Sequence, residues 1–194
     1  GMSVYNNTAF ICAWATACNS IFKVDLNTDQ VVQTIKVAGY APQEALLDKD
    51  QMLWVLSGDQ PEGKTCAWTR IDPSSGDVLG SFQFPPKADA LKPVFNSSRD
   101  TLYFIEADYY GGTTNNGIYR MNINDGALPA QPFVAAKALQ YFYALGIDPE
   151  TGYIYVGDPK GFTQKGSVYI FKQDGTVTDT FNTGLGPGHF YFDE

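Results

Sequence analysis

Short apolar and aromatic runs recur along the chain at a period of about fifty residues, and each repeat contains two of them. The first runs are Phe10–Cys12, Leu53–Val55, Leu102–Phe104 and Ile154–Val156. The second runs are Phe22–Asp25, Thr69–Asp72, Tyr119–Asn122 and Tyr169–Lys172. A fixed period in this range is typical of propeller blades, solenoids and other repeat arrays.

Within one repeat, alternating apolar and polar positions predict four short strands separated by turn residues. In the third repeat these strands are Lys92–Asn96, Thr101–Ala107, Gly117–Ile123 and Gln131–Ala135. The pair Asp125-Gly126 provides the positive φ that a tight hairpin turn requires. Strand, turn, strand, loop, strand, turn, strand is the order of one propeller blade. Many short strands also fit a sandwich, but repetition in register favours the propeller.

We therefore predict one all-β domain over residues 1–194, a β-propeller with four blade-like, four-stranded antiparallel repeats. The chain is expected to open on the second strand of a blade, Thr8–Ala13, and to end on a first strand, Gly188–Asp193. That last strand would complete the N-terminal blade and remove two free sheet edges. The expected repeats are 8–42 with 188–193, 43–90, 91–143 and 144–187. A closed four-bladed ring and half of a larger propeller both stay open.

Composition narrows the class of protein. Apolar residues make up 44% and charged residues 18% of the 194 residues, which is typical of a globular chain. The net charge of −8 argues against nucleic acid, since neutralising phosphates needs clustered Lys and Arg. No apolar stretch approaches the length of a membrane-spanning helix, and the first residues show no secretory signal.

Three cysteines, Cys12, Cys18 and Cys66, leave one unpaired in any disulfide scheme. A Cys12–Cys18 pair is one alternative and free buried cysteines are the other. Their spacing does not match that of a zinc site, and no cofactor is predicted.

Several segments resemble one propeller family. They are Leu53–Gly58, Thr69–Pro73, Thr101–Phe104, Gly117–Met121, Ala144–Pro149 and Gly186–Phe192. These stretches resemble the YncE-like, surface-layer type of β-propeller (the YVTN-repeat group), and most closely its exported lipoproteins from gut Bacteroidetes. The chain is similar only to the C-terminal half of such proteins. The resemblance implies a periplasmic or cell-surface location and, by analogy with some relatives, capture of cobalamin or iron-siderophore complexes beside an outer-membrane transporter.

Binding residues are expected on the longer loops that follow the second and fourth strand of each blade. These loops are rich in aromatic residues, and tyrosine provides a large contact area with a polar tip. The candidate ligand-binding residues are Tyr40, Tyr109, Tyr110, Tyr141, Tyr143 and Phe162. Simple loop packing competes with binding for several of these rings, and Phe142 is expected to pack between blades.

Catalysis has less support. The only histidine, His189, has no nucleophile motif beside it and is read as structural. Propeller lactonases hold calcium with acidic and amide side chains. The corresponding candidates here are Glu44, Asp59, Glu106, Asp108 and Asp158, several of which occupy unequal positions in their repeats.

Two sets of polar residues recur at equivalent positions. Asp25, Asp72 and Asn122 precede hairpin turns and are expected to cap the backbone. Lys23, Arg70 and Arg120 are expected on a solvated blade surface.

We therefore predict a non-catalytic module whose loop-rich face binds a small molecule or a protein. The alternatives are a divalent-metal-dependent lactonase-like hydrolase and a scaffold propeller half that forms a homodimer.

Overall fold

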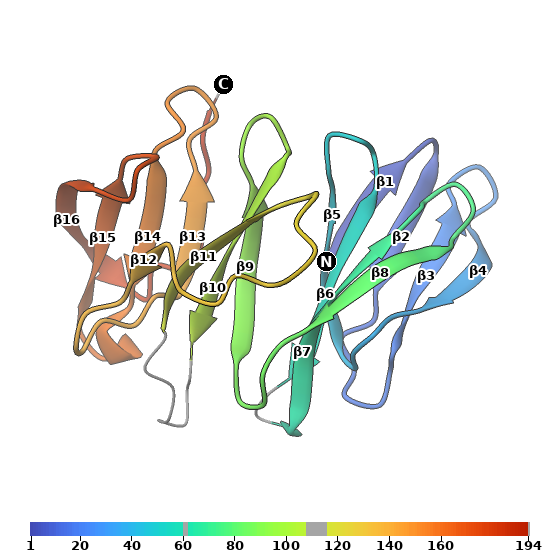
Figure 1. The fold of residues 1–194 in the computed structure, drawn as a ribbon, viewed down its shortest axis with the longest axis horizontal. Helices are drawn as coiled ribbons and strands as arrows, with labels where there is room; N and C mark the ends of the chain where they lie inside the picture. The colour runs from blue at the N-terminus through green and yellow to red at the C-terminus, as the bar shows by residue number, and fades with distance from the viewer. Residues whose placement is uncertain (60–61, 108–115, 194) are drawn as a thin grey trace. The chain divides into compact units, whose positions relative to one another are not determined.

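A computed structural model describes residues 1–59, 62–107 and 116–193, and these residues form four four-stranded antiparallel sheets (Figure 1). Sheet 1 consists of β1 (Met2–Tyr5), β2 (Thr8–Cys12), β3 (Ser20–Asp25) and β4 (Gln30–Lys36). Sheet 2 consists of β5 (Pro42–Leu47), β6 (Leu53–Asp59), β7 (Lys64–Ile71) and β8 (Val78–Gln83). Sheet 3 consists of β9 (Asp89–Phe95), β10 (Thr101–Ala107), β11 (Gly117–Asn122) and β12 (Val134–Ala135). Sheet 4 consists of β13 (Ala144–Ile147), β14 (Ile154–Asp158), β15 (Lys165–Phe171) and β16 (Val177–Leu185).

In every sheet the strands lie side by side in chain order, as in the blade of a propeller. The predicted all-β fold with four blade-like repeats is confirmed. Within the described residues we find no α-helix, and hence no helix that is long and apolar enough to cross a membrane.

The chain divides into two compact units. Unit 1 contains residues 1–89 and 126–128, and so carries sheets 1 and 2. Unit 2 contains residues 90–125 and 129–194, and so carries sheets 3 and 4. The prediction of one domain over 1–194 stays a prediction.

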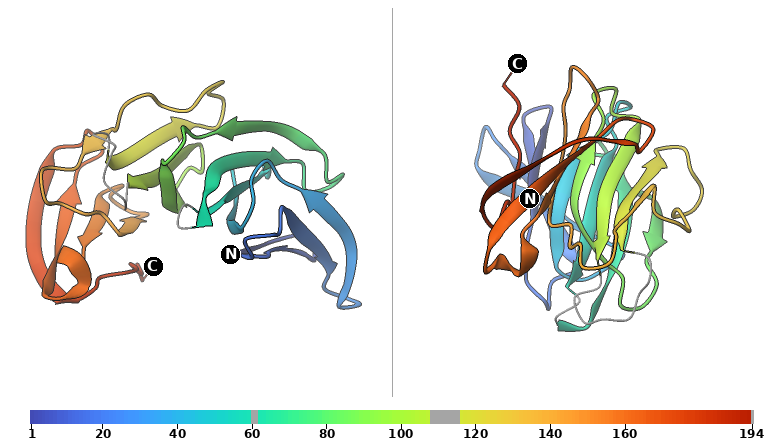
Figure 2. Two further views of the ribbon diagram at one scale, coloured as in Figure 1. Left: turned by 90° about the horizontal axis from the view of Figure 1, so that it is seen from below. Right: turned by 90° about the vertical axis from the view of Figure 1, so that its left-hand side faces the viewer.

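The first sheet is completed by β1 and not by the closing segment 188–193, which corrects the expected strand exchange. β1 pairs with β2 from Met2↔Ile11 to Tyr5↔Thr8, so a first strand precedes the predicted opening strand. The closing segment forms no strand, and Phe190 and Phe192 contact Tyr155 of its own sheet at ring-centroid distances of 5.9 and 5.2 Å. Gly146 makes this possible, because a Cβ there would lie only 2.8 Å from Phe190. Figure 2 shows the course of the closing segment to the C-terminus.

Each unit has its own apolar core built from the inward positions of the strands. In unit 1, Phe10, Ile21, Leu53, Val55 and Ile71 are completely buried in one cluster. In unit 2, a second cluster contains Ile105, Ile118, Phe142, Ile154 and Val156. Phe142 is buried, as predicted.

The predicted backbone caps are confirmed. Carboxylate or amide oxygens of Asp25, Asp72 and Asn122 each accept a backbone N–H two residues further on, at 2.8, 2.8 and 3.0 Å. This is the Asx-turn geometry that fixes a hairpin without help from the rest of the fold.

The recurring cations were expected on a solvated blade surface. Arg120 is exposed, as expected, whereas Lys23 and Arg70 are partly buried. Lys23 Nζ donates to the carbonyls of Pro73 and Ser74, both at 2.9 Å, and so links sheet 1 to a turn of sheet 2. Arg120 donates to the Gln173 carbonyl at 3.2 Å and makes the equivalent link from sheet 3 to sheet 4. Lys23 and Arg120 thus each connect their own sheet to the hairpin turn of the next.

Arg70 pairs within its own sheet. It contacts the buried carboxylate of Asp48 at 3.2 Å, and the same oxygen accepts the Trp54 indole N–H at 2.9 Å. A buried carboxylate is stable in this position because a cation and several N–H donors surround it.

Candidate functional site

Three of the six predicted ligand-binding residues come together in unit 2. The Tyr143 ring lies between its neighbours, 6.3 Å from the Tyr141 ring and 4.9 Å from the Phe162 ring, which it meets edge to face. Lys92 Nζ lies 5.2 Å from the centre of the Tyr143 ring, within cation–π range. We call Tyr141, Tyr143, Phe162 and Lys92 the aromatic cluster.

The other three predicted residues are not part of this cluster. Tyr40 is half-exposed in unit 1, where Lys64 Nζ lies 5.1 Å from the centre of its ring. Tyr109 and Tyr110 lie outside the described residues. Their role in binding stays a prediction.

Phe162 is held in place by an unusual turn. Lys160, Gly161 and Phe162 all have positive φ, at 46°, 72° and 61°, within a single 3-10 turn. For Lys and Phe this conformation is unfavourable, and such strain tends to occur at functional sites. The Asp158 carboxylate stabilises the turn by accepting the Lys160 N–H at 2.9 Å.

The Phe162 ring also packs on backbone. A Cβ at Gly186 would lie 3.2 Å from this ring, and Gly186 itself has a φ of 61°. A glycine thus gives the ring a flat surface to pack on, while about half of the Phe162 side chain remains exposed to solvent.

A cavity of about 530 Å³ opens beside the cluster. Its walls include the rings of Tyr141 and Tyr169, the carboxylate of Asp158 and the amides of Gln140 and Gln164. Its volume lies within the range of roughly 300–1,000 Å³ that is typical of small-molecule sites. Aromatic walls with a few polar groups are the usual composition of such a site.

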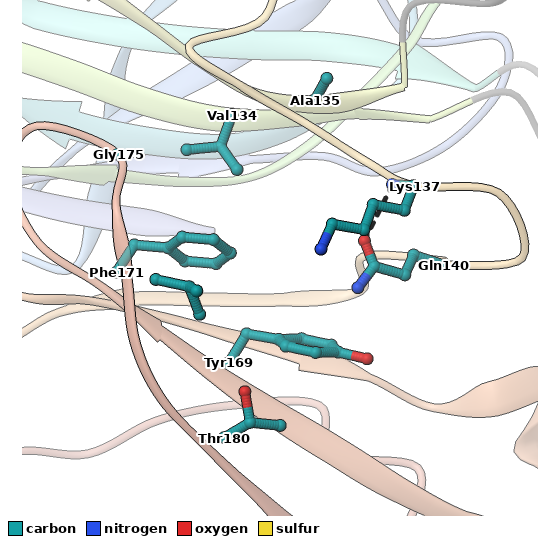
Figure 3. A pocket seen from close by; sticks show the side chains of 9 residues that line it. Val134, Ala135, Lys137, Gln140, Tyr169, Phe171, Gly175 and Thr180 are labelled. Carbon is teal, nitrogen blue, oxygen red and sulfur yellow. Dashed lines mark hydrogen bonds between the residues drawn. The ribbon is translucent and has the colours of Figure 1, made fainter.

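A second cavity of about 280 Å³, drawn in Figure 3, shares Gln140 and Tyr169 with the first. It lies between β12 and the strands β15 and β16. Val134, Phe171 and Val177 provide its apolar surface.

The acidic lactonase candidates are divided between the two units. Glu44 and Asp59 belong to unit 1, Glu106 and Asp158 belong to unit 2, and Asp108 lies outside the described residues. Among residues 1–59, 62–107 and 116–193, no three His, Cys, Asp or Glu side chains are grouped as metal ligands.

Glu106 nevertheless has unusual chemistry. Burial raises the pKa of this carboxyl to about 7, since the charged form is poorly solvated at the end of β10. Burial, and next the Glu106 charge, also raise the pKa of Tyr119 on the neighbouring strand. A carboxyl that titrates near neutral pH is a common feature of functional sites.

The remaining candidates have simpler places. His189 is exposed on the closing segment. Cys12, Cys18 and Cys66 form no disulfide, and desolvation by burial raises the pKa of Cys12 to about 11. A thiol of that kind is unreactive, because little thiolate forms at neutral pH.

Sequence reasoning missed Gln140, Gln164 and Tyr169 as cavity residues. Gln140 and Gln164 lie on predicted loops, so composition alone offered a weak signal. Tyr169 lies in a strand whose alternation indicates only burial. The convergence of strand and loop residues from two sheets becomes visible only in the structure.

No family model and no characterised sequence matches the chain. Solved structures do. The chain is similar to a quinoprotein alcohol dehydrogenase-like protein from Bacteroides thetaiotaomicron, with a TM-score of 0.71 and 16% identity over 94% of this chain and 45% of that one. It is similar to a putative 6-phosphogluconolactonase from Bacteroides fragilis, with a TM-score of 0.66 and 17% identity over 99% and 59% of the two chains.

A gluconolactonase from Xanthomonas campestris also matches, with a TM-score of 0.62 and 15% identity over 100% of this chain and 65% of that one. The chain therefore spans between 45% and 65% of the length of these three proteins. At such low identity these similarities show the propeller fold alone.

Proposed function

We propose that this protein is a non-catalytic binding module of the β-propeller class and that its ligand occupies the 530 Å³ cavity beside the aromatic cluster. The observation that carries this proposal is the contact between Tyr141, Tyr143 and Phe162 at one edge of sheet 4. Rings that already pack on one another lose little entropy on binding, and they offer wide apolar faces to a ligand.

The class of ligand is inferred from the residues that line the 530 Å³ cavity. Two tyrosine rings suit a flat, partly apolar compound, while Asp158 and two glutamine amides provide polar contacts. The family resemblance suggests nutrient capture by an exported protein, with cobalamin or a siderophore complex passed to an outer-membrane transporter. A protein partner on the same loops is the other form of this proposal.

The test is direct binding of cyanocobalamin, haemin and a ferric catecholate siderophore, followed by thermal unfolding and titration calorimetry. A ligand at about 100 times its Kd stabilises the folded state by roughly 2.7 kcal/mol. We expect Tyr141→Ala to weaken binding about tenfold, because Tyr141 belongs to the aromatic cluster and lines the cavity.

Tyr191→Ala is the matched control, since Tyr191 is 85% exposed and does not line the cavity. Equal loss of binding in both variants would contradict the proposed site. Absence of any stabilisation by all three probes at concentrations well above micromolar would contradict the nutrient-capture form.

A lactonase-like hydrolase remains the second candidate, favoured by the names of two similar structures. Its test is hydrolysis of gluconolactone with and without added Ca²⁺, comparing the wild type with Asp158→Asn. Hydrolysis that depends on both Ca²⁺ and Asp158 would replace the binding proposal. The scaffold alternative predicts a homodimer by light scattering, and a monomer would exclude it.

A further inference from the structure

The 280 Å³ cavity between β12 and the strands β15 and β16 is distinct from the aromatic cluster. Its floor is apolar: Phe171 is almost fully buried, and Val134 and Val177 lie around it. Gly175, at the turn before β16, has a φ of 86° and carries no side chain that would narrow the cavity.

The rim of the cavity presents hydrogen-bond donors. Figure 3 shows the Lys137 ammonium directed into the space between the two sheets, with Gln140 beside it. The Gln140 Oε1 already accepts the backbone N–H of Lys137 at 2.8 Å, so its remaining polar group is the donating NH₂. The Tyr169 hydroxyl points toward the same side of the cavity (Figure 3).

Negative charge does not balance these donors. Among the described residues that line the cavity, none is acidic. Asp174, at the adjacent turn, does not line the cavity, and its carboxylate accepts the backbone N–H of Thr176 at 2.8 Å. The cavity thus combines an apolar floor with an exposed cation that forms no ion pair among the described residues.

We propose that this cavity binds a small carboxylate with a short apolar chain, independently of the function assigned above. The carboxylate accepts hydrogen bonds from the Lys137 ammonium and the Gln140 amide, which are stronger for a charged acceptor. The chain lies on Phe171, Val134 and Val177 and is removed from water there. The volume, just below the usual range for small-molecule sites, excludes long or branched acids.

The probe is hexanoate, with hexylamine and hexanol as matched compounds of equal chain length, and the readout is saturation-transfer NMR and calorimetric titration. For a ligand of this size we expect a Kd of roughly 1 mM. Hexanol should bind about tenfold more weakly than hexanoate, because a neutral head group gains less from the lysine. Hexylamine should not bind measurably.

Three variants test the residues. Lys137→Gln should raise the Kd for hexanoate about tenfold and leave the Kd for hexanol unchanged. Thr180→Trp should abolish binding of both compounds by filling the cavity, and Thr180 is exposed, so the larger side chain does not disturb a core. Lys165→Gln, a lysine of the same strand as Tyr169 that does not line the cavity, should behave as the wild type.

Unchanged thermal unfolding of the three variants shows that each is folded. The proposal is overturned if hexylamine binds as tightly as hexanoate, or if Lys137→Gln and Lys165→Gln have the same effect. It is also overturned if hexanoate shows no saturation transfer at tens of millimolar, whatever the outcome for cobalamin or haemin.

Discussion

Sheets 2 and 3 can be compared position by position, because each is one copy of the same repeat. The residues on one face of the two sheets are similar in kind, whereas several of those on the other face differ. On the first face the register is the same: Trp54 pairs with Arg70 across β6 and β7, and Tyr103 pairs with Arg120 across β10 and β11. In both sheets the arginine lies over an aromatic ring. Arg70 is 5.5 Å from the Trp54 ring centre, and Arg120 is 3.8 Å from that of Phe133.

The second face keeps a leucine at Leu53 and Leu102 but differs at the next two positions along the strand. Sheet 2 pairs Val55 with Thr69 there, whereas sheet 3 pairs Phe104 with Tyr119, whose rings stack at 5.7 Å. One step further along the strand, the small Ser57 of sheet 2 corresponds to Glu106 in sheet 3.

The difference between Ser57 and Glu106 shows which features are common to the repeats and which can vary. A hydroxyl can be buried cheaply because it bonds to nearby backbone, as Ser57 does with the Ala67 carbonyl at 3.3 Å. A carboxyl loses more hydration on burial, and where burial is the main influence, as at Glu106, its pKa rises. The repeat therefore conserves packing and turn geometry, while single positions on one face remain free to acquire chemistry.

The largest expected effect is on the free energy of unfolding and concerns the first face, which sheets 2 and 3 share. Trp54→Ala should lower the free energy of unfolding of unit 1 by roughly 3–5 kcal/mol, because the indole is completely buried and its N–H satisfies the Asp48 carboxylate. Urea unfolding followed by fluorescence measures this change. Tyr103→Ala should cost less, since the Tyr103 ring is smaller than an indole and, unlike Trp54, it does not donate to a buried carboxylate such as Asp48. Equal losses would show that the first face contributes equally to stability in sheets 2 and 3.

The second-largest expected effect is on the pH dependence of stability and concerns Glu106. Its pKa of about 7 in the folded protein exceeds that of an unfolded glutamate. The contribution of Glu106 to the stability of the protein is therefore greatest below about pH 4.5 and falls as the pH rises toward 7. Glu106→Gln should remove this slope, which amounts to roughly 1–3 kcal/mol between pH 5 and pH 8. Urea midpoints at both pH values, compared with the wild type, measure it. Ser57→Ala is the control and should leave the pH dependence unchanged, and a slope that persists in Glu106→Gln would refute the burial argument.

The smallest expected effect is on the free energy of unfolding and concerns the hydroxyl of Thr69 in sheet 2. Thr69 Oγ1 accepts the backbone N–H of Ala38 at 2.9 Å. Thr69→Val keeps the shape of the side chain but leaves that N–H without its acceptor, at a cost of roughly 1 kcal/mol. The same urea experiment detects this loss, with Thr69→Ser as the control that restores the bond. A neutral Thr69→Val would mean that the N–H finds water instead.

Much of the fold follows from local pattern. The predicted strand Thr101–Ala107 is observed with the same ends, and the Asx caps at Asp25, Asp72 and Asn122 form as expected. These features depend on alternation and on short-range hydrogen bonds, which are encoded in neighbouring residues.

Other features depend on contacts between distant segments and were not predictable. The segment 188–193 has the apolar composition of a strand, yet its rings pack on Tyr155 and over Gly146 without pairing. The predicted strand Gln131–Ala135 is reduced to Val134 and Ala135, because its neighbour β11 pairs only with these two residues.

The candidate site was predicted in part for the same reason. Loop tyrosines are a compositional signal, and Tyr141, Tyr143 and Phe162 do come together. The cavities depend on how two sheets approach the segment 136–143, and no sequence pattern encodes the distance between them.

The bonds from Lys23 and Arg120 to the turn carbonyls of the following sheet have a consequence for protein engineering. Because the donor belongs to one repeat and the acceptor to the next, the repeats are not independent parts. A repeat that is transplanted, deleted or duplicated keeps its own hairpin but loses the partner of its cation. When repeats are rearranged by design, the chain must therefore be divided so that each basic residue stays in the same fragment as the turn whose carbonyl it binds.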